Sequence, residues 1–135
     1  MKYMLIMNTP RDGYQQYMNW PKKVLEANAA FMQAFSARLK ASGELVGAEG
    51  LCSPEQALRV RAGKDGKPIT DGVFPETKEF LAGYWIIDVP SQERALEVAA
   101  EASTAPGALV TDSAGKPIDH FWIELRQVMG SHKDL

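Results

Sequence analysis

The chain has few of the side chains that most enzyme chemistry relies on: its 135 residues include one cysteine and two histidines. A lone cysteine, Cys52, cannot form an internal disulfide, so a reducing cytoplasm is the expected compartment. Because only His120 and His132 are present to activate its thiol, we interpret Cys52 as a small filler and not as a nucleophile. The sequence also lacks metal-ligand spacing, a glycine-rich phosphate loop and a nucleophile elbow, so we expect no metal and no cofactor.

An excess of basic residues and a long apolar run are absent as well. The formal net charge is -2, which argues against direct binding to a nucleic-acid backbone. The apolar run near the N-terminus ends at Asn8 and is too short for a secretory signal or a membrane span. We therefore expect a cytoplasmic protein with no membrane contact. With 45% hydrophobic and 24% charged residues, we expect one globular domain over residues 1–135, with a flexible tail from about residue 129.

The hydrophobic pattern predicts the order strand, helix, two or three strands, helix, strand. The expected segments are a strand over 2–7, a helix with apolar residues at Val24, Phe31, Phe35 and Leu39, strands over 44–51, 57–62 and 80–89, a helix over 92–103 and a strand over 120–128. Asn19 and Ser91 are predicted to cap the two helices, and Gly43 to end the first one. Asp65-Gly66 is a strong signal for a hairpin turn.

This order predicts an α+β fold. Right-handed crossovers turn it into a ferredoxin-like βαββαβ antiparallel sheet with both helices on one face. The other face would then be uncovered and would carry large side chains. Since an uncovered apolar face usually marks an interface, we expect a homodimer that closes sheet against sheet.

Four segments resemble the DGPF branch of the YCII-related proteins. They are GAEGL at residues 47–51, TDGVFPETKE at 70–79, GYWIIDVPS at 83–91 and IELRQV at 123–128. Their order and approximate spacing match along most of the chain, and the ETKE part after the Asp-Gly turn is the most specific. The resemblance implies a dimeric α+β barrel built from ferredoxin-like subunits, with a cleft between sheet and helices.

The chain departs from this family pattern in three ways. Val73 stands where the DGPF motif has its proline, which makes the turn less rigid. The stretch 106–119 is longer than is common before the last strand and is expected to reshape or cover one side of the cleft. The wider family is associated with a His–Asp pair whose histidine lies early in the chain. No histidine precedes His120 here, so that pair cannot be carried over.

Asp71 is the candidate catalytic residue. It precedes Gly72 at a turn, where its carboxylate either accepts backbone N–H groups or acts as a general base at the mouth of a cleft. The resemblance places this motif beside the site of the family. His120, next to Asp119, is interpreted as a structural or surface residue and not as a catalyst.

Five further side chains are candidates for substrate binding: Glu49, Glu76, Lys78, Tyr84 and Arg126. In an extended segment Glu76 and Lys78 point the same way, so they either clamp a polar ligand or form a solvated loop. Arg126 and Glu49 would bind a carboxylate or a phenol if their face of the sheet is the inner one. Otherwise such residues form cross-strand salt bridges. Tyr84 is either a core residue or a hydroxyl donor.

Two functions follow from these observations. The first is a cofactor-independent lyase or isomerase that acts on a small polar aromatic or carbonyl compound by proton transfer, with Asp71 as the base. The second is a non-catalytic ligand-binding or interaction module, because relatives of the DGPF branch are often linked with alternative sigma factors. Both functions need the same cleft and the same dimer, so the sequence leaves them open.

Overall fold

The structure is a computed structural model that describes residues 1–74, 76–107, 110–111, 114, 117–118 and 122–130. His120, His132 and half of the predicted long stretch 106–119 lie outside the described residues. The elements are β1 (Lys2–Pro10), α1 (Gly13–Met18), α2 (Lys22–Ala41), β2 (Leu45–Gly50), the 3-10 turn η1 (Pro54–Gln56), β3 (Arg59–Ala62), β4 (Pro68–Asp71), β5 (Glu79–Asp88), α3 (Gln92–Ala102), β6 (Val110–Thr111), β7 (Pro117–Ile118) and β8 (Ile123–Gln127).

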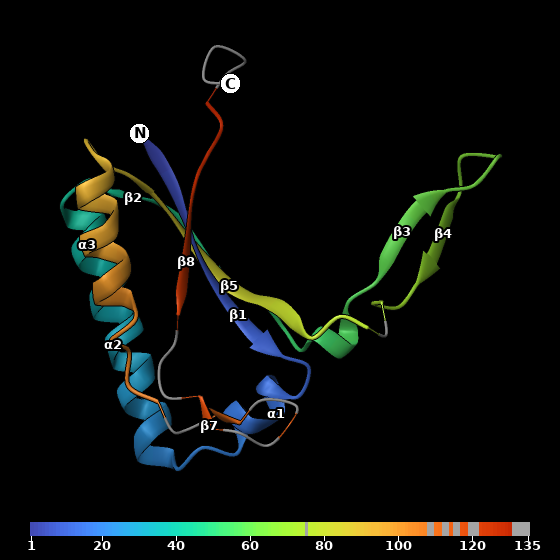
Figure 1. The fold of residues 1–135 in the computed structure, drawn as a ribbon, viewed down its shortest axis with the longest axis horizontal. Helices are drawn as coiled ribbons and strands as arrows, with labels where there is room; N and C mark the ends of the chain where they lie inside the picture. Colours follow the sequence, from blue (N-terminus) through green and yellow to red (C-terminus); the bar gives the residue numbers. More distant parts are fainter. Residues whose placement is uncertain (75, 108–109, 112–113, 115–116, 119–121, 131–135) are drawn as a thin grey trace.

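The main sheet has the strand order β2-β5-β1-β8, and its neighbouring strands are antiparallel. This order, with α2 and α3 on one face, is the ferredoxin-like arrangement, so the predicted fold is confirmed (Figure 1). The arrangement arises because β1 and β5, both strongly apolar, pair along nearly their whole length at the centre of the sheet.

The hydrophobic core lies between the sheet and the helices. Tyr3 pairs with Ile87 and Leu5 pairs with Trp85, and all four side chains are buried on the same face. The helices complete the core with Phe35 and Leu39 from α2 and with Ala95, Val98, Ala99 and Ala102 from α3. The small alanine side chains of α3 allow its backbone to approach the sheet closely.

The signals that start and stop the helices are mostly confirmed. The hydroxyl of Ser91 accepts a hydrogen bond from the backbone N–H of Arg94, 3.1 Å away, and caps α3. Gly43, with φ 79°, ends the turn after α2 in the left-handed conformation that glycine adopts without strain. The prediction for Asn19 was wrong: Pro21 occupies the N-cap of α2, and Asn19 instead ends α1, with its amide donating to the carbonyl oxygen of Gln15.

Strands β3 and β4 form a separate two-stranded hairpin that projects away from the body, on the side of the sheet opposite the helices (Figure 1). We call residues 58–74 the arm. Its tip confirms the predicted turn, since Gly66 has φ 80° and Asp65 Oδ1 accepts the backbone N–H of Lys67 at 3.0 Å. The alternation of residues 57–62 predicted a strand correctly, but Leu58 and Val60 do not contribute to the core.

No helix in the described part of the chain has the length and apolarity needed to cross a membrane.

Candidate binding cleft

A cleft of about 870 Å³ opens between one end of the main sheet and the helices α1 and α2. Its lining includes the end of β1, where the pairing with β5 shifts register between Met7 and Asn8. Such a bulge bends a strand and increases its twist, and it often lies beside functional sites. Strands β2 and β5 and the approach to β8 supply the rest of the sheet side.

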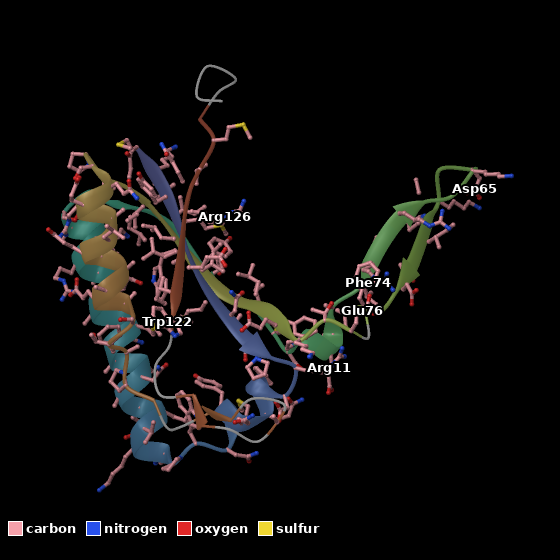
Figure 2. All side chains as sticks on the ribbon, in the orientation of Figure 1. Arg11, Asp65, Phe74, Glu76, Trp122 and Arg126 are labelled. Carbon is pink, nitrogen blue, oxygen red and sulfur yellow. The ribbon has the colours of Figure 1, made fainter. Side chains whose placement is uncertain are left out.

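Aromatic rings dominate the side of the cleft formed by α1. Tyr14 and Tyr17 are one helical turn apart, with ring centroids 6.5 Å from each other, and both line the cleft. Trp20 continues this row after the helix ends, at 5.2 Å from Tyr17 in an edge-to-face arrangement. Trp122, just before β8, also lines the cleft although its side chain is 86% exposed (Figure 2). An exposed tryptophan at a cleft presents a large flat surface to a ligand.

Two glycines let the backbone segments around the cleft approach each other. A Cβ atom on Gly13 would lie 1.7 Å from Thr9 Oγ1 and 3.2 Å from Pro10 Cδ, so the absence of a side chain brings α1 onto the end of β1. A Cβ atom on Gly83 would lie 2.9 Å from the carbonyl oxygen of Glu49, on the neighbouring strand. Both glycines line the cleft, and both are buried.

The ionisable side chains in the described lining of the cleft do not include a basic one. Among the described residues, its lining contains no arginine, lysine or histidine. Asn28 is buried on α2 and donates to the carbonyl oxygen of Pro106 at 2.8 Å, which ties the chain after α3 to the wall of the cleft. Further polar atoms in the lining come from Ser36, from the exposed Cys52 and from Glu79.

Three of the predicted binding residues lie on the open face of the main sheet, the face without helices. The strand register places Glu49, Tyr84, Ile6 and Glu124 in one row across the four strands. Arg126 lies in the next row, opposite Met4, and Figure 2 shows it on the outer side of β8. Glu49, Tyr84 and Glu124 also border the cleft, whereas Arg126 does not line it.

The other three predicted residues lie at the end of the arm and in the loop that follows it. Asp71, at the end of β4, forms an ion pair with Arg59 at 3.0 Å, and its Oδ1 accepts the backbone N–H of Gly72 at 2.8 Å. Glu76 and Lys78 are exposed in the loop from the arm to β5 and do not line the cleft. Figure 2 shows Glu76 near the base of the arm. Only Glu79, the last residue of the ETKE segment, reaches the cleft. The six predicted side chains are therefore not gathered in one place within this chain.

The cleft residues that the sequence-based prediction missed include Tyr14 and Tyr17 of α1, Trp20 after it, Glu79 and Trp122. The segment YQQYMNW places aromatic residues at positions 14, 17 and 20, three apart, which brings them to one side of a helix. That spacing was a usable signal, but the helix is only six residues long. Within the part of the chain that the structure describes, no group of three His, Cys, Asp or Glu residues is placed to hold a metal ion.

A comparison with curated proteins finds no match for this chain. The YCII-related domain, in contrast, matches residues 1–119, which is most of the sequence and includes the arm and the greater part of the cleft. The family has an α+β barrel fold, in agreement with the four-stranded antiparallel sheet and its helices. On this match, the chain belongs to the family of YCII-related domains.

Proposed function

We propose that this protein binds a small, flat aromatic compound, uncharged or positively charged, in the cleft between the main sheet and α1. The observation that carries the proposal is the lining of the cleft. It combines the rings of Tyr14, Tyr17, Trp20 and Trp122 with the carboxylate of Glu79, and among the described residues it has no basic side chain.

The size and composition of the cleft support a small-molecule ligand. Its volume of about 870 Å³ lies within the range of roughly 300–1,000 Å³ that is usual for such sites. Aromatic faces attract cations through the quadrupole of the ring, with a gain of about 0.5–2 kcal/mol. An organic acid would bring a negative charge toward Glu79, which disfavours it.

Proton-transfer chemistry in this cleft, of the lyase or isomerase type, would use Glu79 as the base. Asp71 fits this role less well, because it is paired with Arg59 on the arm and its side chain is 79% exposed. Glu79 begins β5 opposite Pro10, at the end of the sheet where the cleft opens. A general base must lie within hydrogen-bond reach of its substrate, and of these two carboxylates Glu79 is the one that lines the cleft.

We also propose that a second copy of the chain covers the open face of the main sheet. The centre of this face consists of Met4, Ile6, Tyr84 and Ile86, and its border carries Glu49, Glu124 and Arg126. In a two-fold dimer the same patch meets itself, so the arginine of one copy is able to pair with a carboxylate of the other. An interface of this kind requires a total buried area of about 1,200–2,000 Å².

Thermal unfolding with three indole compounds of different charge tests the binding proposal. Tryptamine, indole and indole-3-acetate share the ring and differ in the charge of the side chain. A ligand present at about 100 times its dissociation constant adds about 2.7 kcal/mol to the free energy of unfolding. We expect tryptamine and indole to raise the melting temperature more than indole-3-acetate does. Equal or stronger stabilisation by the acid would refute the proposed ligand class.

A further inference from the structure

The arm has an apolar surface that its own chain leaves uncovered. Leu58 is 66% exposed and Val60 is 62% exposed, and the alternation of β3 puts both on the face that also carries Ala62 and its partner Pro68, which are exposed as well. In the described part of the chain β3 and β4 pack mainly against each other. An isolated two-stranded hairpin is only marginally stable in water, and a contiguous apolar patch usually marks a contact site.

The base of the arm is held in a defined direction. The guanidinium of Arg59 lies 3.8 Å from the centroid of the Phe74 ring and also pairs with Asp71. Arg11, in the turn after β1, donates to the carbonyl oxygen of Phe74 at 3.4 Å and lies over the ring of Phe80. These contacts join the base of the arm to the end of the main sheet, from which the arm projects (Figure 2).

The direction and the charge of the arm both indicate what it contacts. The arm extends on the side of the open sheet face, where a second copy stacked on that face would lie (Figure 1). Residues 58–74 contain four basic and two acidic residues, a net charge of +2. Because the whole chain carries -2, the remainder carries a charge of -4 and attracts the arm of another copy.

We propose that the arm is a clasp that packs its apolar side against the body of a second copy of this chain. The inference rests on the sheet-to-sheet dimer proposed above. In a two-fold dimer each copy holds the other with its own arm, so the clasp adds two equivalent contacts outside the sheet interface. The ion pair of Asp71 with Arg59 then has a structural role, because it keeps the clasp in shape.

Photo-crosslinking tests the clasp directly. The residue p-benzoylphenylalanine is introduced in place of Val60 on the arm or, as a matched control, in place of Leu96 on α3. Leu96 is 53% exposed and lies on the helix side of the sheet, away from the proposed interface. Light scattering gives the mass of each protein before irradiation, and a denaturing gel gives the covalent product. We expect a dimer, with a crosslinked band for the Val60 position at least tenfold stronger than for the Leu96 position.

The outcomes separate the clasp from the dimer. A dimer by light scattering with equal, weak crosslinking at both positions would overturn the clasp and leave the sheet interface standing. A monomer would overturn both proposals. As a second measurement, Val60→Asp should raise the dimer dissociation constant about tenfold or more, whereas Leu96→Asp should leave it within about twofold. Equal effects of the two substitutions would also refute the clasp.

Discussion

Glu44 and Arg94 form a bidentate ion pair that joins the loop after α2 to the first turn of α3, although they are fifty positions apart in the sequence. The Nε atom of Arg94 lies 2.8 Å from Oε2 of Glu44, and Nη2 lies 2.9 Å from Oε1. The hydrogen bonds from Arg94, and then that from the Ser42 hydroxyl, lower the pKa of Glu44 to about 2. The same contact raises the pKa of Arg94.

Replacing Glu44 by Gln should destabilise the fold by about 1–2 kcal/mol at pH 7. A charge-assisted pair of hydrogen bonds contributes this much when one partner is largely shielded, as Glu44 is with a side chain 15% exposed. The free energy of unfolding from urea titrations measures the loss. Glu26→Gln is the matched control, because Glu26 forms only an exposed pair with Lys22 at 3.8 Å, and its loss should cost less than about 0.5 kcal/mol.

The contribution of Glu44 should also depend on pH in a defined window. The pKa of the Glu44 carboxyl is about 2 in the folded chain, whereas its ordinary value of 4.5 applies to the unfolded chain. The unfolded chain therefore binds the proton first as the pH falls. The stabilisation is complete above about pH 4.5 and is lost progressively down to about pH 2. The difference in the free energy of unfolding between the wild type and Glu44→Gln should therefore shrink from pH 7 to pH 3. If this difference stays constant over that range, the ion pair is not its cause.

Gly83→Ala should both destabilise the protein and narrow the cleft. The added Cβ would lie 2.9 Å from the backbone oxygen of Glu49, so β2 and β5 must separate. Overpacking of this kind costs about 1–3 kcal/mol. Gly47→Ala is the control on the same strand pair, because its Cβ would meet no atom within 4 Å and should change stability by less than about 0.5 kcal/mol. Chemical denaturation compares the two variants, and equal stability would contradict the proposed close approach.

Trp122→Ala should weaken ligand binding without affecting the fold. The ring is 86% exposed, so its removal creates no cavity, but it takes away a flat surface at the cleft. Tryptamine affinity, measured by calorimetry, should fall about fivefold to tenfold. Met129→Ala serves as the control, because Met129 is also exposed but does not line the cleft. If both substitutions leave the affinity unchanged, Trp122 is not part of the binding surface.

Glu79→Gln should reduce the preference for a positively charged ligand. Glu79 lines the cleft and carries the charge expected to favour tryptamine over indole-3-acetate. Its neutralisation should lower the ratio of the tryptamine affinity to the indole-3-acetate affinity about threefold or more. The affinity for uncharged indole should stay nearly constant. Glu93→Gln, on an exposed residue of α3 outside the cleft, should leave the ratio unchanged. The affinities for tryptamine, indole-3-acetate and indole are measured for each variant, and an unchanged ratio in Glu79→Gln would contradict the prediction.

The main sheet was predictable from sequence because its core strands and helices follow a regular apolar pattern. The residues of β1 and β5 are apolar in runs of strand length, and α2 repeats its apolar positions at helical spacing. The arm was not predictable in the same way. Alternation in the segment around Val60 signals a two-faced strand, but it does not reveal whether the chain itself covers the apolar face. The resemblance alone placed the DGVFPETKE motif beside the site, but its residues 71–74 belong to the arm and, among its described residues, only Glu79 reaches the cleft.

The accessibility of Cys52 tests the central proposal most directly. It is the single cysteine of the chain, it is exposed and it lines the cleft, so a thiol reagent reports on that place alone. The rate of its modification is measured with and without tryptamine, with indole-3-acetate as the comparison of opposite charge. A ligand that fills the cleft should slow the reaction at least fivefold, and tryptamine should do so at a lower concentration than the acid. Unchanged rates with both compounds, or better protection by the acid, would contradict a cleft for uncharged or positively charged aromatic compounds.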